Sequence, residues 1–463
     1  MSASEQQYRT ESDSMGEVKI PGWAYWGAQT QRAVENFGVS AQRIPNAMIQ
    51  ALALIKKHAA RTNGALGTVE RTLTDAIEKA ASEVLDGKWN EHFPIDVFQT
   101  GSGTSWNMNI NELLANRANE ILGSPLGQRS PVHPNDHVNR GQSSNDVIPT
   151  AVHIADRVEA ENLLESLEVL HTAFSEKAKE FSDIVKIGRT HLQDAVPMTL
   201  GQEFGAFATQ VSKARKRVSQ ALSSLEELAL GGTAVGTGLN CHPDFAGQAI
   251  AGIAAETGLA FRAAEDRFEA IATRDAQVEL MGALNSVATT FMKIANDLRL
   301  LASGPRAGLG EIVLPSLQPG SSIMPGKVNP VIPEMVIQVA AHVNGKAVSV
   351  TIAGQNSPLE LNMMHPLVAL ETLSSISLLS NTAQALARRC VHGITADRER
   401  CDYWIEWSLA LVTPLATEIG YDRASKLAYK AYKEKRTIRD VVLEENVLPE
   451  ERVNELLDPR SMI

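Results

Sequence analysis

The sequence contains very little cysteine. Cys241, Cys390 and Cys401 are the only three cysteines among 463 residues. An odd number of cysteines at irregular spacing provides neither a disulfide framework nor the paired ligands of a metal site. Such usage suits a reducing compartment, and we expect a cytoplasmic protein. The first twenty residues hold several acids and no apolar segment, so no secretory leader is predicted.

The chain also lacks an excess of positive charge and any long apolar run. Its formal net charge of -11 at pH 7 disfavours nucleic acids and anionic membranes as main partners. No uninterrupted apolar stretch has the length needed to cross a bilayer, so no membrane segment is predicted. Aromatic residues make up only 5% of the chain, whereas alanine and leucine are plentiful. This composition favours helices over sheets.

Proline is missing from long stretches in the middle of the chain. None lies between Pro149 and Pro197 or between Pro243 and Pro305. Apolar residues there recur at three- and four-residue spacing, which is the pattern of a helix buried along one face. We predict five long helices, at about residues 150–187, 200–229, 265–302, 332–353 and 366–390.

Helices of this length favour an all-α fold built on a long bundle. We predict a central bundle domain over residues 141–396, a smaller α-rich domain over residues 1–140, and a small α domain over residues 397–463. The first 43 residues show little helical periodicity. The apolar stripes of five long helices are too extensive for one subunit to cover. The sequence therefore predicts a homo-oligomer that shares its helix bundle.

The segment from Gly320 to Pro330, G-S-S-I-M-P-G-K-V-N-P, has a composition that core packing does not need. Its glycines free the backbone and its prolines fix it, while two serines and Lys327 supply polar groups. Asn329 is a good N-cap for a helix that starts at Pro330, and the free amides of that helix start would attract an anion. The segment is either a mobile loop that carries chemistry or an ordinary glycine-rich connector.

Two further polar stretches have similar composition. Residues 100–112, T-G-S-G-T-S-W-N-M-N-I-N-E, offer hydroxyls and amides suited to a carboxylate, or they form a Ser/Thr cap on the next helix. Residues 133–150, H-P-N-D-H-V-N-R-G-Q-S-S-N-D-V-I-P-T, carry a second serine pair, or they start a helix capped by Asn145 or Asp146. The two histidines of this stretch lack a third ligand at convincing spacing, which disfavours a metal site.

A third stretch, G-R-T-H-L-Q-D-A-V-P at residues 188–197, is a short polar break between two predicted long helices. It contains His191, whose imidazole titrates near neutral pH and can therefore serve as an acid or a base. A single histidine is more often structural than catalytic, so both interpretations remain open on this observation alone.

Taken together, these segments resemble the three signature regions of the fumarase/aspartase superfamily. The motif G-S-S-x-M-P-x-K-x-N-P is highly specific for that superfamily, and the resemblance extends from Tyr25-Trp26-Gly27 to the tail. It implies homotetramers with a twenty-helix core, active sites assembled from three subunits, and reversible elimination reactions that release fumarate.

Thr190-His191 is similar to class II fumarases, whereas aspartases of otherwise similar sequence have Thr-Gln there. The stretches W-G-A-Q-T-Q-R and G-T-G-L-N-C-H-P also resemble class II fumarases. The resemblance implies hydration of fumarate to (S)-malate, a step of the tricarboxylic acid cycle, by anti addition through an aci-carboxylate intermediate, with no metal or other cofactor. The alternatives are an aspartate ammonia-lyase, or a helical scaffold that has lost activity as some lens proteins of the superfamily have.

The resemblance also assigns roles to residues. Ser321 is implied as the base that removes the C3 proton, and His191, paired with Glu334, handles the water or the leaving hydroxyl. Lys327 and Asn329 would stabilise the developing negative charge. Further substrate contacts are implied at Ser102, Gly103, Thr104, Ser143, Ser144, Asn145, Thr190, Ser322 and Val328. A second, non-catalytic anion site is implied at His133, Pro134, Asn135 and Asp136, where Arg129 is the candidate for the basic residue that many relatives carry nearby.

Overall fold

The structure is a computed structural model, which describes residues 8–463. The prediction that no leader is present therefore falls partly outside the described residues. The chain divides into two compact units, each described here by itself. Unit 1 comprises the chain up to Leu164 together with residues 216–286 and 342–379, and unit 2 comprises residues 165–215, 287–341 and 380–463.

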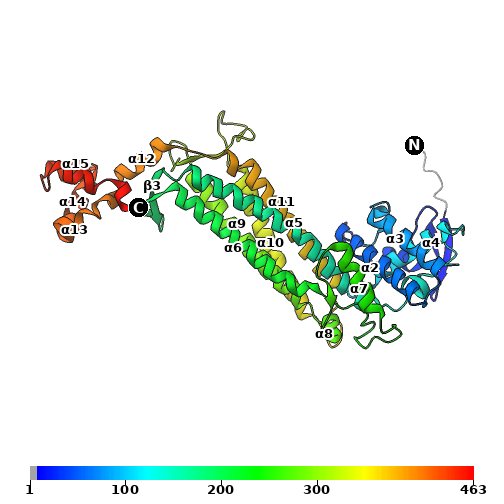
Figure 1. Cartoon of the computed structure of the whole chain (residues 1–463). Coiled ribbons are helices and arrows are strands. Elements are labelled where there is room, and N and C mark those ends of the chain that lie inside the picture. Colours follow the sequence, from blue (N-terminus) through cyan, green and yellow to red (C-terminus); the bar gives the residue numbers. More distant parts are fainter. Residues whose placement is uncertain (1–7) are drawn as a thin grey trace. The chain divides into compact units, whose positions relative to one another are not determined.

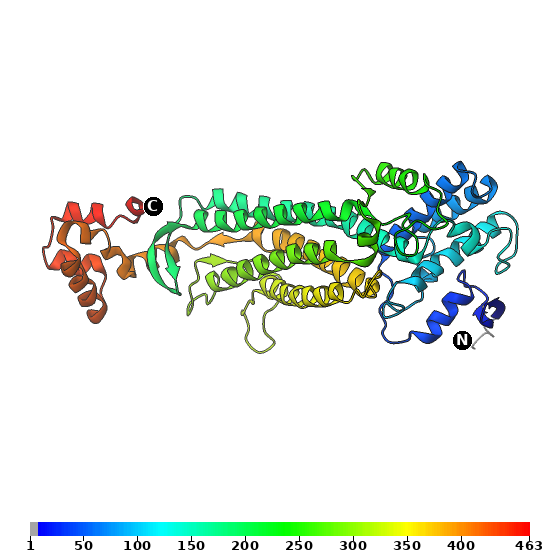
Figure 2. The same ribbon diagram turned by 90° about the horizontal axis from the view of Figure 1, so that it is seen from below.

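The described residues include the five long helices that the proline pattern predicts, each of which contributes residues to both units. They are α5 (Ser144–Glu180), α6 (Leu200–Ala221), α9 (Asp275–Leu301), α10 (Val331–Gln355) and α11 (His365–Arg389). Figures 1 and 2 show the unit 2 portions of α5 and α6 side by side, where Phe174 packs against Phe204 and Phe207. No helix among residues 8–463 is both long and apolar enough to cross a membrane.

Unit 1 also contains a hairpin and shorter helices near the start of the chain. These are β1 (Tyr8–Asp13), β2 (Gly16–Pro21), α1 (Ala28–Asn36), α2 (Asn46–Ala65), α3 (Arg71–Leu85), α4 (Thr104–Ile121) and α7 (Phe245–Thr257). Their apolar faces share one core, in which Leu52, Trp106 and Phe245 are fully buried. This core fixes the start of α4, where part of the candidate site lies.

Unit 2 ends in short helices with a core of their own. They are α12 (Arg398–Trp407), α13 (Leu415–Ile419), α14 (Tyr421–Glu434), α15 (Ile438–Glu444) and α16 (Glu450–Leu456). Leu415, Val441 and Val453 are fully buried among them. The same unit contains the hairpin of β3 (Val185–Thr190) and β4 (Gln193–Thr199), and the antiparallel pair of β7 (Ile312–Val313) and β8 (Thr395–Ala396).

Several boundaries differ from the predicted ones. The first predicted long helix begins earlier, at Ser144, and ends at Glu180, because the β-branched segment after it pairs as β3 with β4. The second ends at Ala221 and is followed by β5 (Glu227–Leu228), which pairs in parallel with β6 (Arg262–Ala263). Tertiary strand pairing overrides helical periodicity at both places.

The third predicted helix is two helices, α8 (Arg267–Ala272) and α9. Asp266 caps α8 by accepting hydrogen bonds from the amides of Phe268 and Glu269, at 2.7 and 3.1 Å. Thr273 then adopts an extended conformation, with φ -108° and ψ 167°, which breaks the helix before α9. The first 43 residues also contain more structure than their periodicity predicts. The Arg9 side chain donates to the carbonyls of Pro21, Ala24 and Trp26 and so orders the segment before α1.

A buried carboxyl group in unit 1 makes stability depend on pH. Asp156 of α5 is fully buried, and its Oδ1 accepts a hydrogen bond of 2.7 Å from Thr372 of α11. Burial raises the pKa of Asp156 from its ordinary 3.8 to about 8. The folded state therefore holds a proton that the unfolded state loses above pH 3.8, so the contribution of Asp156 to stability falls as pH rises toward 8.

We predict that Asp156→Asn removes this pH dependence. The amide oxygen of asparagine still accepts the hydrogen bond from Thr372, and the side chain does not titrate. The slope of unfolding free energy against pH should differ from wild type by up to about 1.4 kcal/mol per pH unit. Urea unfolding at fixed protein concentration measures it, with the exposed Asp75→Asn in α3 as control. Equal slopes for wild type and Asp156→Asn would contradict the prediction.

Candidate functional site

Three hydroxyl groups meet at the starts of two helices in unit 1. Ser102 Oγ lies 2.7 Å from Thr104 Oγ1, which lies 2.7 Å from Ser144 Oγ. Helix α4 begins at Thr104 and α5 begins at Ser144. The first amides of a helix have no partner within it, and they carry partial positive charge. Hydroxyls and amides together form a cradle suited to a carboxylate, which we call the hydroxyl cluster.

Two glycines set the backbone of this cluster. Gly103 has φ +72°, and a Cβ atom there would lie 2.8 Å from the side chain of Ile148. A Cβ atom at Gly101 would lie 2.0 Å from the carbonyl oxygen of Met363. Only glycine satisfies both the left-handed conformation and the close packing at Gly103. The turn before α4 is therefore held rigidly, with Ser102 and Thr104 on either side of Gly103.

Ser143 and Asp146 cap α5 reciprocally. The amide of Ser143 donates to Asp146 Oδ1 at 2.9 Å, and the amide of Asn145 donates to Ser143 Oγ at 3.2 Å. The predicted cap, Asn145 or Asp146, is thus only partly right, because Ser143 provides the N-cap oxygen. The side chain of Asn145 instead donates to the carbonyl of Ala234, at 2.8 Å.

Asp146 also links the start of α5 to a second loop. Its Oδ2 accepts hydrogen bonds from the amides of Gly231 and Thr233, both at 2.9 Å. The carboxylate is fully buried, and this burial raises the pKa of Asp146 to about 6 against the lowering effect of its amide donors. Asp146 therefore fixes the segment from Ser143 to Asn145 against the loop that ends at Ala234.

Lys56 of α2 supports the same region from the other side. Its ammonium group is fully buried and donates to Asn139 Oδ1 and Gln142 Oε1, both at 2.9 Å. Burial lowers the pKa of Lys56 to about 7, and the nearby charge of Asp146 raises it in part. Lys56 was not among the residues predicted from the sequence. The sequence feature that could have indicated it is the pair Lys56-Lys57 in the apolar run A-L-A-L-I-K-K-H. In a helix through this run, one of the two lysines points toward the core.

The predicted second anion site is a capped turn. His133 precedes a single π-helical turn, η2 (Pro134–Val138). Its Nδ1 accepts from the amides of Asn135 and Asp136, at 3.3 and 3.2 Å. The His133 imidazole therefore faces its own backbone in this structure. Within residues 8–463, no group of three or more His, Cys, Asp or Glu side chains could hold a metal ion.

The glycine-rich segment before α10 is a closed loop in unit 2. The amide of Gly320 donates to the carbonyl of Lys327 at 2.9 Å, and the side chain of Asn329 donates to the carbonyl of Gly320 at 2.6 Å. A Cβ atom at Gly320 would lie 2.3 Å from the Lys327 carbonyl oxygen, so only glycine allows this closure. Ser322, Lys327 and Val328 are exposed along the loop.

Ser321 Oγ is held by its own loop. The amides of Ile323 and Met324 donate to it, at 3.2 and 3.0 Å. These two hydrogen bonds fix the position of the Ser321 hydroxyl within the loop.

The predicted helix cap at Asn329 is wrong. Helix α10 begins at Val331, and the Asn329 side chain faces Gly320 instead of the helix amides. The amide of Val331 donates to the carbonyl of Asn329 at 2.9 Å. Closing the loop therefore takes precedence over capping the helix. Glu334 lies in the first turn of α10, where its amide bonds to Pro330.

Thr190 and His191 lie at the tip of the β3–β4 hairpin. His191 and Leu192 have φ of +55° and +59° and form its two-residue turn, in which Thr190 pairs with Gln193. Both Thr190 and His191 are exposed. The short polar break predicted here is therefore a strand hairpin, which projects the imidazole from a defined turn.

A buried ionic cluster, also missed from the sequence, anchors this hairpin. Glu311 is fully buried and forms ion pairs with Lys186 at 3.2 Å and with Arg189 at 2.8 Å. Lys186 also pairs with Glu203 of α6, at 2.7 Å. Lys186 and Arg189 belong to β3, so the cluster fixes the strand that leads to Thr190 and His191.

Within unit 1 the structure thus brings Ser102, Thr104 and Ser144 together. Within unit 2, Ser321 and Asn329 share one closed loop, whereas the described residues hold no ion pair between His191 and Glu334. The hydroxyl cluster belongs to unit 1, and the loop and the hairpin tip belong to unit 2.

Comparisons with known proteins place these features in a family. A model of the lyase family matches residues 16–345, and a model of the fumarase C C-terminus matches residues 411–463. Fumarate hydratase class II from Neisseria meningitidis is 49% identical over 98% of this chain and 99% of its own length. The chain belongs to the class II fumarase family. Mitochondrial fumarate hydratase of Mus musculus is 50% identical over 100% of this chain and 91% of its own length.

A crystal structure of the recombinant class II fumarase from Schistosoma mansoni supports the same assignment. It superimposes with a TM-score of 0.96 at 41% identity, over 98% of this chain and 99% of that one. The predicted all-α class II fumarase fold is confirmed, and so is the prediction that the chain is a lyase of the fumarate hydratase type.

We predict that Lys56→Met changes how stability depends on pH. The unfolded lysine keeps its proton up to its ordinary pKa of 10.5, whereas the folded one loses it near pH 7, so Lys56 makes wild type more stable as pH rises from about 7. The variant lacks this rise. At high pH it should be less stable by about 1–3 kcal/mol, because Asn139 and Gln142 lose their donor.

Urea unfolding across this pH range, with the exposed Lys79→Met as control, measures the effect. The deficit of Lys56→Met should shrink as the pH is lowered toward 7. A deficit that stays constant with pH would show that Lys56 does not change its protonation on folding.

Proposed function

We propose that this chain hydrates fumarate reversibly to (S)-malate through an aci-carboxylate intermediate. The observation that carries this proposal is the hydroxyl cluster, in which Ser102, Thr104 and Ser144 line the starts of two helices. Such a cradle suits the carboxylate of a small dicarboxylate. In the same proposal, Gly103, Ser143 and Asn145 contribute backbone or amide contacts to the substrate.

We assign the removal of the C3 proton of malate to Ser321. The free hydroxyl is a very weak acid, so this role needs a stabilised alkoxide. The amides of Ile323 and Met324 supply part of that stabilisation at 3.2 and 3.0 Å. Lys327 and Asn329, on the same loop, would stabilise the charge that develops on the substrate carboxylate. Ser322 and Val328 complete the contacts proposed for this loop.

His191 is the proposed acid and base for the other half of the reaction. It would protonate the leaving hydroxyl in dehydration and activate water in hydration. Thr190 would contact the substrate beside it, and Glu334 would tune the imidazole. In this proposal three subunits of a homotetramer each supply one group, namely the hydroxyl cluster, the hairpin tip and the loop. Pairing of His191 with Glu334 would then occur between subunits.

Other features of the prediction belong to the same proposal. The segment from His133 to Asp136 is the proposed second anion site, which would require the His133 ring to turn away from the amides it now accepts. The domain limits near residues 140 and 396 and the cytoplasmic location remain predictions. The relatives include proteins named as mitochondrial as well as bacterial ones.

Loss of ultraviolet absorbance by fumarate tests the reaction directly. Fumarate alone should be consumed by the purified chain and malate should form, and added ammonium should not raise the rate. Consumption that requires ammonium would indicate an ammonia-lyase, and no consumption in either condition would indicate an inactive scaffold.

We predict that His191→Asn lowers kcat by about a hundredfold or more, because general acid-base catalysis is worth that much. Asparagine tolerates the left-handed conformation of this turn, so the hairpin should remain folded. The matched control is His392→Asn, at a partly exposed histidine with no proposed role. Unchanged kcat in His191→Asn would remove His191 from the mechanism.

We further predict that Ser321→Ala strongly slows proton removal while substrate binding persists. Exchange of the malate C3 proton with deuterated water, followed by NMR, should fall by about a hundredfold or more. Ser316→Ala, at an exposed serine just before the loop, should exchange at the wild-type rate. Wild-type exchange in Ser321→Ala would assign the base to another group.

A further inference from the structure

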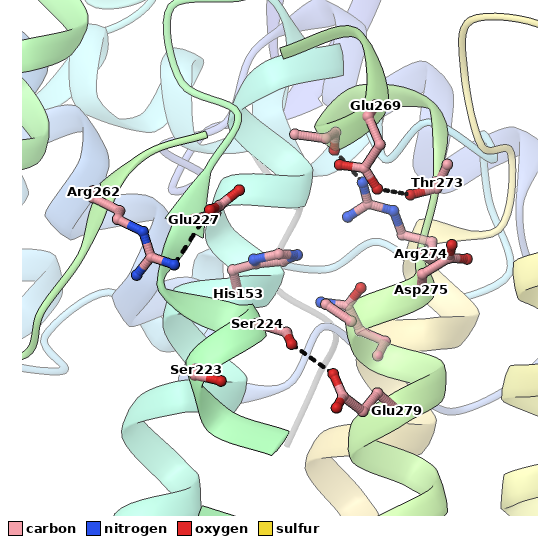
Figure 3. A pocket seen from close by; sticks show the side chains of 13 residues that line it. His153, Ser223, Ser224, Glu227, Arg262, Glu269, Thr273, Arg274, Asp275 and Glu279 are labelled. Atoms are coloured by element: carbon pink, nitrogen blue, oxygen red, sulfur yellow. Dashed lines mark hydrogen bonds and ion pairs between the residues drawn. The ribbon is translucent and has the colours of Figure 1, made fainter. Parts of the chain in front are cut away.

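A cavity of about 500 Å³ in unit 1 is lined by none of the residues assigned to fumarate hydration. It lies where the N-terminal turn of α9 and the loop before it approach α5, β5 and β6, and Figure 3 shows its lining. The volume is sufficient for a small metabolite. Its walls are mostly polar or charged, so the expected ligand is polar as well.

Arg274 provides a buried cation at this cavity. It is only 1% exposed, and its Nε and Nη1 atoms have no hydrogen-bond partner, whereas Nη2 donates to the carbonyl of Ala270. Burial lowers the pKa of Arg274 to about 10, so the group still carries its charge near neutral pH. The Nε and Nη1 N–H groups lie on opposite edges of the guanidinium, so each can donate to a separate acceptor oxygen.

Gln277 and His153 add buried polar atoms to the same wall. The Gln277 side chain is fully buried, and neither its nitrogen nor its oxygen has a partner. His153 Nδ1 is likewise without a partner, and burial lowers the pKa of His153 to about 3, so the ring is neutral. In Figure 3 the His153 ring points from α5 toward the space between Arg274 and Ser224. Buried polar atoms without partners are rare in folded proteins.

The remaining charges of the cavity are mainly negative. Its lining contains four carboxylates, at Glu227, Glu269, Asp275 and Glu279, against the two guanidinium groups of Arg262 and Arg274. Arg262 pairs with Glu227 at 3.2 Å. Glu279 accepts a hydrogen bond of 2.5 Å from Ser224 and retains further acceptor positions. A ligand with only negative charges would be repelled here, whereas a ligand that also carries a positive charge would find a carboxylate partner for it.

We propose that this cavity binds a small zwitterion, an α-amino acid with a short side chain. The carboxylate accepts hydrogen bonds from one free N–H of Arg274 and from the amide of Gln277, and the ammonium group faces Glu279 and Glu227. This ligand satisfies an unpaired donor of the buried guanidinium, and its ammonium group meets the excess of carboxylates in the lining. Substrate dicarboxylates are excluded, because their second negative charge would meet the carboxylates of the cavity.

Isothermal titration calorimetry on the intact chain tests the proposal. L-alanine and L-serine are the zwitterionic probes, acetate carries the carboxylate alone, and ethylammonium carries the cation alone. Each titration is repeated with excess succinate, which would occupy the dicarboxylate site. We expect the amino acids to bind with and without succinate, and acetate and ethylammonium each to bind at least about tenfold more weakly.

Two variants locate the binding. Arg274→Met removes the guanidinium and Glu279→Gln removes a partner of the ammonium group, and each should weaken L-alanine binding about tenfold or more. Arg71→Met, at an exposed arginine of α3, is the control and should bind as wild type does. Arg274→Met removes a buried charge without an ionic partner, so it should fold, and thermal unfolding verifies this.

Three results would overturn the proposal. They are the absence of amino-acid binding to wild type, binding of acetate as tight as that of L-alanine, and unchanged L-alanine affinity in folded Arg274→Met. Competition by succinate would also overturn it, since the ligand would then occupy the dicarboxylate site. None of these results depends on whether the chain hydrates fumarate.

Discussion

The hydroxyl cluster depends on one buried carboxylate. Asp146 accepts three backbone hydrogen bonds, which hold Ser143 at the start of α5 and Gly231 and Thr233 in a distant loop. An ionised carboxylate is costly to bury, and three amide donors together with the nearby charge of Lys56 offset much of that cost. These hydrogen bonds fix the positions of Ser144 and Asn145, which cannot shift without breaking them. The groups proposed to contact the substrate carboxylate are thereby held in place by the fold.

In unit 2, too, a buried carboxylate holds a polar segment in place. The fully buried Glu311 holds Lys186 and Arg189 of β3, and the next residues along the strand are Thr190 and His191 at the exposed turn. In the loop before α10, backbone hydrogen bonds take the place of ion pairs. His191 and Lys327 are exposed, and Ser321 and Asn329 are half-buried, on segments that these contacts hold in place. Such separately stabilised pieces are well suited to an active site completed by other subunits, since each keeps its geometry without the others.

Whether a feature could be predicted from the sequence depends on how far apart in the chain its interacting residues lie. The loop of Gly320–Pro330 and the serine-rich helix starts are determined by neighbouring residues, and their character is readable from composition and spacing. Lys56 and Glu311 were missed because their importance depends on partners far away in the chain, and the charge of Lys56 in a periodic helix resembles a solvated one. The β3–β4 hairpin was missed for a related reason, since its strands are stabilised by pairing and by Glu311 more than by local propensity. The Asn329 cap was wrong because a bond to Gly320 competes with the helix amides.

Arg274 differs from these other buried charges in a way that bears on its role. Asp146 and Glu311 are each surrounded by donors or cations from the chain itself, so their burial is explained by the fold they hold together. Arg274 donates a hydrogen bond only to the carbonyl of Ala270, with the charges of Glu269 and Asp275 nearby, and the Gln277 side chain has no hydrogen-bond partner. A methionine would fill the same volume without desolvating a charge, and buried ionic groups are often replaced by apolar ones at no loss of stability. The proposed zwitterion would give the buried guanidinium an acceptor, and its ammonium group would meet the surrounding carboxylates.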